Sequence, residues 1–72
     1  MKRLNLGFIQ RRRTEREITL LELALVLGFK NASTYMKYEK GNYTFKADQL
    51  PLLAKVLDCT IEELFFENDL LK

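Results

Sequence analysis

Apolar residues recur every three or four positions along most of this 72-residue chain. That spacing places them on one face of a helix, whereas a half-buried strand would alternate apolar and polar residues. The pattern therefore predicts an all-α chain with five helices and no strand. Their expected bounds are about 5–16, 20–27, 32–40, 47–57 and 60–66, followed by a tail over 67–72.

The segment 19–41 contains the most informative pattern. Thr19 opens a T-x-x-E capping box before a short apolar helix. Ala24 is small where a following helix can cross closely, and Gly28 and Gly41 stand where the two helices end. Glycine adopts the left-handed conformation of such ends without steric cost. Two short helices joined by a tight turn predict a helix-turn-helix unit, whose second helix enters the major groove in DNA-binding proteins.

The apolar positions on the expected inner faces define a single core, as a chain of this length allows. A second T-x-x-E capping box, Thr60 with Glu63, marks the start of the last helix. Cys59 is expected to be a small buried residue rather than a reactive thiol, because no basic partner is evident. The predicted core comprises Ile9, Ile18, Leu23, Ala24, Leu27, Tyr35, Tyr38, Leu50, Leu53, Ala54, Leu57, Cys59, Ile61 and Leu64.

The net charge of +2 conceals an uneven distribution. Residues 1–16 carry six basic groups and one acid, a net charge of +5, and residues 29–46 carry four lysines and one acid, a net charge of +3. Residues 17–28 and 47–72 carry net charges of −2 and −4. A fold that gathers the basic segments on one face would present a cationic patch to a polyanion. An ordinary solvated surface is the alternative that charge alone leaves open.

The sequence lacks the residues of several classes of functional site. It contains no histidine and one cysteine, which excludes an internal disulfide and a Cys/His zinc site. It has no G-x-S-x-G sequence and no phosphate-binding glycine loop, and Glu62 and Glu63 are explained by helix capping. We therefore expect no catalytic residue, no metal, no cofactor and no enzymatic activity.

No targeting or membrane segment is recognisable in the chain. The N-terminal sequence MKRLNLGF lacks the apolar stretch of a secretory signal. No apolar run approaches the roughly 18 residues of a membrane span. A single free cysteine fits a reducing compartment, so we expect a cytoplasmic protein.

Four segments carry a specific combination of residues, namely IT at 18–19, LALVLGF at 23–29, YEKG at 38–41 and LPLLAKVLDCTIEELF at 50–65. Together they resemble the Cro/lambda-repressor-like (XRE-type) family of helix-turn-helix transcription regulators. The resemblance implies a compact five-helix lambda-repressor-like DNA-binding domain, one domain over residues 1–72. It further implies a sequence-specific regulator, expected to be a repressor, that binds double-stranded DNA at a palindromic operator as a homodimer.

Relatives commonly have one residue fewer between the glycines that correspond to Gly28 and Gly41. The extra residue of this chain is assigned to the turn at 29–30. This alignment places Tyr35 and Tyr38 at the two apolar positions that anchor the DNA-reading helix, whereas the ungapped one would bury Thr34 and Lys37. The residues then implied for base contacts are Asn31, Ala32, Ser33, Met36 and Lys37. Phosphate contacts are implied for Lys30, Lys40, Tyr43, Lys46 and Arg11. The alternative for each is an exposed residue without a DNA contact.

Two ionic residues correspond to a buried pair in relatives. Arg13 matches the arginine of that pair, and Glu39 matches the acid. Glu39 is also the only acid of the second basic segment, which supports a specific role. The resemblance therefore implies a structural ion pair, and leaves Arg11, Arg12 and Arg16 available to solvent or phosphates.

The expected 20–27 helix is apolar nearly all round, where relatives tend to be polar or charged. Its apolar residues outside the predicted core are Leu20, Leu21, Leu25 and Val26. The apolar surface of such a helix is either covered by other parts of the chain or binds another protein. Coverage by Phe8, Phe29 and the long side chains of the first helix is one alternative. The other is a protein-interaction module, antitoxin- or inhibitor-like, that uses this helix to bind another protein.

The C-terminal part, acidic and apolar, is the expected dimer interface, because the basic face must remain free for DNA. Phe65 and Phe66 are adjacent on a short expected helix and cannot both point into the core. One of them, with Leu70 or Leu71, is therefore expected to meet its symmetry mate. The alternative is a single exposed aromatic residue on a monomer.

Overall fold

The computed structural model describes residues 3–66, and over that range it contains four α-helices, two 3-10 helices and no strand. The α-helices are α1 (Leu6–Glu15), α2 (Leu20–Val26), α3 (Ala32–Glu39) and α4 (Leu50–Leu57), and the 3-10 helices are η1 (Ala47–Gln49) and η2 (Glu62–Leu64). The all-α class predicted from apolar spacing is confirmed. The count of five helices is not, because the last expected helix is only the 3-10 turn η2.

Side-chain caps fix where the first three helices begin. Asn5 caps α1 by accepting the Phe8 N–H. At α2 the Thr19 hydroxyl accepts the Glu22 N–H at 3.0 Å, and the Glu22 carboxylate accepts the Thr19 N–H at 2.8 Å. This reciprocal pair is the capping box that the sequence predicts.

The last expected helix ends early because its backbone turns to another partner. The Thr60–Glu63 capping box forms, with distances of 2.8 and 3.1 Å. Phe65 is then extended, and the Leu64 carbonyl accepts the Asn5 N–H at 2.7 Å. A single antiparallel bridge between Leu4 and Phe65 joins the two ends of the described chain. These bonds satisfy backbone groups that a longer helix would otherwise bind internally.

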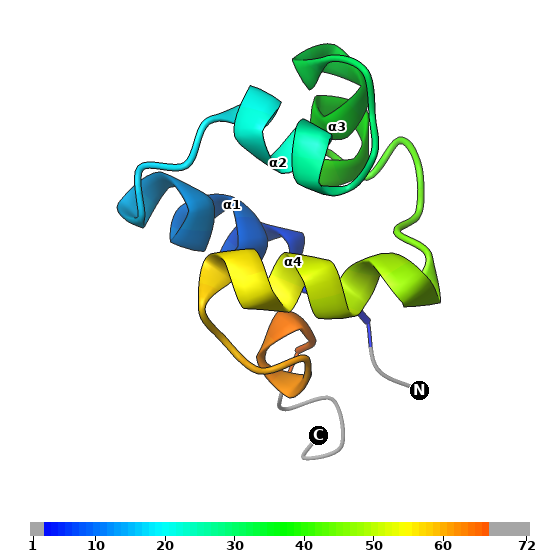
Figure 1. Cartoon of the computed structure of the whole chain (residues 1–72). Coiled ribbons are helices and arrows are strands. Elements are labelled where there is room, and N and C mark those ends of the chain that lie inside the picture. Colours follow the sequence, from blue (N-terminus) through cyan, green and yellow to red (C-terminus); the bar gives the residue numbers. More distant parts are fainter. Residues whose placement is uncertain (1–2, 67–72) are drawn as a thin grey trace.

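The helices form two pairs that pack against each other. Figure 1 shows α2 and α3 on one side, above α1 and α4. Ala24 of α2 is fully buried, in agreement with the need for a small residue beside α3. Gly28 and Gly41 both have positive φ, +87° and +91°. A Cβ on Gly41 would also lie 3.3 Å from a methyl group of Leu6, which would have to shift slightly, so the positive φ is the stronger reason for a glycine there.

The core agrees with the predicted set except at its edges. The buried apolar residues are Ile9, Leu23, Ala24, Leu27, Tyr35, Phe45, Leu53, Ala54, Leu57 and Leu64. Ile61 was wrongly assigned to the core: it is 40% exposed beside η2. Phe45, expected in a connecting loop, is buried against Tyr35 and Tyr38. Cys59 is half-buried, and this burial raises the pKa of its thiol.

A buried ionic network joins α1, α3 and the segment before α2. Glu39 is only 6% exposed, and Arg13 donates to both of its carboxylate oxygens, at 2.9 and 3.1 Å. The Tyr35 hydroxyl donates a third bond to Glu39 at 2.8 Å, and Arg13 also donates to the Ile18 carbonyl at 3.1 Å. The hydrogen bond with Glu39 raises the pKa of Arg13, and burial raises that of Tyr35.

A second arginine of α1 contributes to stability instead of remaining available to phosphates, and the residue that caps the helix forms a surface ion pair. Arg12 donates to the carbonyls of Leu57 and Asp58, both at 2.8 Å, and so binds the C-terminal end of α4. Arg16 forms an ion pair with the Asp58 carboxylate at 3.4 Å. The expectation that Arg12 stays available to solvent or phosphates is therefore wrong, whereas Arg16 is exposed and its availability stays a prediction. The cause is the αL conformation of Asp58, which ends α4 beside α1.

Replacing Glu39 with alanine is expected to destabilise the fold strongly. The change leaves the Arg13 charge and the Tyr35 hydroxyl buried without their common partner, at a cost of about 3–5 kcal/mol. Thermal melts followed by circular dichroism would measure the loss as a lower midpoint. Glu62→Ala is the matched control, since Glu62 is exposed in η2. Equal midpoints for the two variants would show that the ion pair does not stabilise the domain.

Candidate nucleic-acid interface

The surface of α3 divides into a buried side and a solvent side. Tyr35 is fully buried, whereas Ser33 and Lys37, four residues apart on one face, are exposed. Ala32 and Met36, also four apart, are half-buried. The residues expected from the sequence to contact bases therefore lie away from the core, in agreement with the one-residue gap assigned to the turn.

Asn31 caps α3, and this role limits how it can bind DNA. Its Oδ1 accepts three hydrogen bonds of 2.9 Å, from the Thr34 N–H, the Thr34 hydroxyl and the Ser33 hydroxyl. A bidentate contact with adenine needs both the oxygen and the amide nitrogen of an asparagine. While the cap persists, Asn31 offers only amide N–H donors and Ser33 offers only an acceptor oxygen.

Four exposed lysines lie on α3 and on the segments next to it in the chain. Lys30 lies in the turn before the helix, Lys37 on it, Lys40 at its C-cap and Lys46 before η1, and all four are exposed. Glu39, the one acid of this segment, is neutralised by Arg13. None of the four lysines forms an ion pair with a residue in the part of the chain that the structure describes. The segment 29–46 therefore carries four exposed positive charges that no acid in residues 3–66 pairs with.

The other two expected phosphate contacts are also at the surface. Arg11 is exposed on α1, and its guanidinium lies 5.9 Å from the ring centroid of Phe8. Tyr43 follows α3 in the loop 41–46 and is 49% exposed. Its ring packs edge-on against Tyr38, at 5.3 Å between centroids. The structure thus brings Tyr43 next to α3 and leaves Arg11 on a different helix.

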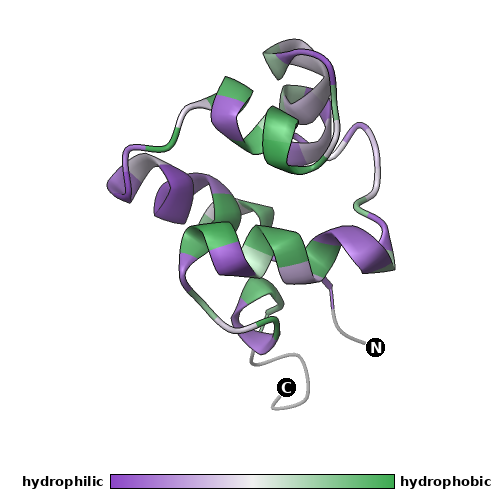
Figure 2. Cartoon of the chain, in the orientation of Figure 1, coloured by the Kyte–Doolittle hydropathy of each residue, from purple (hydrophilic) through white to green (hydrophobic). Residues whose placement is uncertain are grey.

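A second exposed surface is apolar. Leu21, Leu25 and Val26 of α2 are exposed, Leu25 by 60%. Figure 2 shows hydrophobic residues along α2 and α4, in contrast to the hydrophilic second half of α1. Leu20, the fourth apolar residue of α2 outside the predicted core, does pack against the core. Coverage of α2 by Phe8, Phe29 and the first helix, one of the two alternatives, is therefore wrong for these three residues.

The expected dimer residues are only partly described. Phe65 packs against the core, while Phe66 is half-buried with the Arg3 guanidinium 5.0 Å from its ring centroid. The two residues follow η2 in an extended segment instead of sharing a helix, so they point to opposite sides. Leu70 and Leu71 lie outside the described residues.

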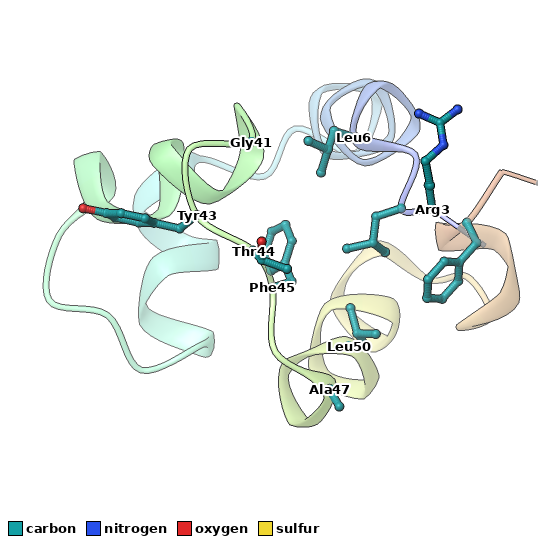
Figure 3. A pocket seen from close by; sticks show the side chains of 10 residues that line it. Arg3, Leu6, Gly41, Tyr43, Thr44, Phe45, Ala47 and Leu50 are labelled. Carbon is teal, nitrogen blue, oxygen red and sulfur yellow. The ribbon is translucent and has the colours of Figure 1, made fainter. Parts of the chain in front are cut away.

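A pocket of about 490 Å³ lies behind the loop that follows α3 (Figure 3). Its lining is mostly apolar and comprises Arg3, Leu4, Leu6, Gly41, Tyr43, Thr44, Phe45, Ala47, Leu50 and Phe65. In Figure 3 the Arg3 guanidinium and the Tyr43 hydroxyl point away from the centre of the pocket. The lining thus offers apolar contact without a charged group directed at a ligand.

Sequence reasoning missed two features of this surface. The first is the engagement of Asn31, although an asparagine just before a helix is a strong capping signal. The second is the approach of Lys37 to Tyr43, whose ring centroid lies 5.8 Å from the Lys37 Nζ. Nothing in the residue spacing indicates this contact, because it depends on how the loop after Gly41 folds back.

Residues 3–66 lack two other kinds of site, a metal-binding cluster and a membrane-spanning helix. No group of three or more histidine, cysteine, aspartate or glutamate side chains within that range could hold a metal ion. No helix there has the length and apolar character required to cross a membrane.

Comparison with known proteins identifies the family. No curated protein and no solved structure matches the chain significantly. Residues 9–64, from α1 through η2, match the family described as Helix-turn-helix. The match covers most of the chain and includes both helices of the turn unit and α4. The chain therefore belongs to the XRE-type, Cro/lambda-repressor-like helix-turn-helix family of DNA-binding regulators.

Proposed function

We propose that this protein is a sequence-specific transcriptional repressor that binds a palindromic operator as a homodimer. The observation that carries the proposal is the group of four exposed lysines on α3 and on the segments next to it in the chain, none of which forms an ion pair with a described residue. A protein that bound only other proteins would not need this charge. Family membership supports DNA binding in general, and the cytoplasmic location and the absence of enzymatic activity stay predictions.

The α3 surface is proposed to read bases in the major groove. Lys37 would donate to guanine or to a phosphate, and the Ser33 oxygen would accept from a base edge. Ala32 and Met36 would contact thymine methyl groups. Asn31 is proposed to donate its amide N–H to a nearby phosphate or base acceptor, because its oxygen caps the helix.

The flanking residues are proposed to bind the sugar-phosphate backbone. Lys30, Lys40 and Lys46 would neutralise phosphates on either side of α3, and the Tyr43 hydroxyl and Arg11 are further candidates. Such contacts fix the position of the protein on the duplex without distinguishing sequences. They also release condensed counterions, so affinity should depend strongly on salt.

A homodimer is proposed because one domain offers too few base contacts for high specificity. Two copies would place their α3 helices in successive major grooves about 34 Å apart. Phe66, Leu70 and Leu71 are proposed for the interface, because Phe65 packs against the core and leaves Phe66 as the outward phenylalanine. The acidic charge of the C-terminal segment supports this choice, since it leaves the lysines free.

A second candidate function rests on the exposed apolar face of α2. Leu21, Leu25 and Val26 would bind another protein in an antitoxin- or inhibitor-like role. Exposed apolar side chains grouped on one short helix favour this candidate, because such groups commonly mark interaction sites.

Removing single lysines is expected to separate base contacts from phosphate contacts. For the wild type, log K should fall linearly with log[salt]. Lys40→Ala should weaken binding to all duplexes alike and lower that slope by about one. Lys37→Ala should also relax sequence preference. Fluorescence anisotropy with random and genomic duplexes would measure both, and a lack of affinity at low salt would refute the DNA-binding proposal.

Leu25→Ser is expected to leave DNA binding unchanged. The side chain is exposed on α2, so the change should alter the free energy of unfolding by no more than about 0.5 kcal/mol. The same anisotropy assay would compare this variant with the wild type, with Lys37→Ala as the control that weakens binding. If Leu25→Ser also weakened DNA binding, the apolar face would belong to the DNA or dimer interface and not to a separate partner.

Phe66→Ser is expected to dissociate the proposed dimer. Sedimentation at micromolar concentration, with and without DNA, would report the mass of the wild type and the variant. Phe65→Ser is the comparison: because Phe65 packs against the core, that change should also lower the melting temperature. A wild type that sediments as a monomer in both conditions would contradict the dimer.

A further inference from the structure

We infer that the aromatic ring of Tyr43 determines sequence specificity by holding the Lys37 side chain in position, a role that rests on the proposed DNA-binding function. The sequence led us to expect a different contribution from Tyr43, a hydroxyl bound to phosphate. The contacts of the ring point to a further action, through Lys37.

The loop after α3 is attached to Lys37 through the backbone. The Lys37 carbonyl accepts the Asn42 N–H at 2.8 Å and the Tyr43 N–H at 3.3 Å. Gly41 makes this reversal possible, since its φ is +91° and a side chain there would meet Leu6. Tyr43 therefore returns to the last turn of α3, at the level of Lys37.

The position of the Tyr43 ring is set by aromatic residues beneath it. Tyr43 packs edge-on against Tyr38, and Tyr38 stacks on Phe29 with 4.7 Å between centroids. Phe45, which is buried, contacts Tyr38 from the loop with 5.5 Å between centroids. Although Tyr43 is half exposed, this packing restricts the direction of its ring.

Lys37 lies beside this restricted ring, with its Nζ 5.8 Å from the Tyr43 centroid. A cation at this distance is attracted by the electron-rich face of an aromatic ring. A lysine side chain in solvent otherwise samples many rotamers, and ordering it on DNA costs free energy. The ring contact favours a smaller set of rotamers before DNA arrives, so Lys37 is presented in one direction from α3.

The two roles of Tyr43 predict different consequences for binding. A hydroxyl that donates to phosphate would strengthen binding to every sequence equally, because phosphates carry no sequence information. A ring that positions Lys37 would change the discrimination between duplexes at the base pair that Lys37 contacts. Tyr43→Phe removes only the hydroxyl, whereas Tyr43→Leu removes the ring.

A double-mutant cycle on DNA tests this inference. Duplexes would first be selected from a random library with the wild type, and the base pair at which Lys37→Ala loses discrimination would be identified. The ratio of dissociation constants for the changed and the selected duplex would then be measured for the wild type, Lys37→Ala, Tyr43→Leu, Tyr43→Phe and Lys37→Ala/Tyr43→Leu. Melting temperatures would be recorded for all five proteins.

The expected loss of discrimination is roughly tenfold for Lys37→Ala, about two- to fivefold for Tyr43→Leu and none for Tyr43→Phe. In the Lys37→Ala background, Tyr43→Leu should cause no further loss. Independent effects of the two changes, or equal losses for Tyr43→Phe and Tyr43→Leu, would overturn the inference while leaving DNA binding intact. A wild type that binds all duplexes equally would also overturn it.

A measurement without DNA separates this inference from the proposed function. In the free protein the Tyr43 ring current should shift the Lys37 side-chain methylene protons upfield in NMR spectra. The shift should persist in Tyr43→Phe and disappear in Tyr43→Leu. Its absence from the wild type would overturn the inference, whereas a wild type with the shift but no DNA affinity would refute the proposed function and the specificity role with it.

Discussion

The buried carboxylate of Glu39 requires three elements to keep fixed positions around it. Its hydrogen-bond partners are Arg13 from α1 and Tyr35 from α3, and Arg13 is itself held by the Ile18 carbonyl before α2. An unpaired carboxylate in this place would cost several kcal/mol. Because Glu39 and Lys37 belong to the same helix, the network that satisfies Glu39 also sets how α3 presents its solvent side.

Sequence reasoning succeeded where the cause is local. Capping residues such as Thr19 act over three residues, and Gly28 marks the end of α2 by its own conformation. Alignment with the family pattern, with one extra residue in the turn, predicts that Tyr35 is buried and Lys37 is exposed, and the structure confirms both. Each of these features is determined within one or two helical turns, and the residue pattern therefore contains enough information.

Reasoning from the sequence failed where a residue contacts a group that is distant along the chain. Arg12 binds carbonyl groups 45 and 46 residues away, and no local pattern indicates that α4 ends beside it. Phe45 resembles a loop residue because its neighbours are polar, yet the loop returns it to the core. The last helix stops at Leu64 because backbone groups of the N-terminal segment compete for its hydrogen bonds. Such contacts follow from the assembled fold.

The bridge between Leu4 and Phe65 has a consequence for building on this domain. It brings the two ends of the described chain together, below α1 and α4 in Figure 1, whereas α3 lies above them. A module joined directly at residue 3 or at residue 66 would leave from the same edge of the domain, opposite α3. A short linker between the ends would also permit circular permutation, with new termini opened in an exposed loop.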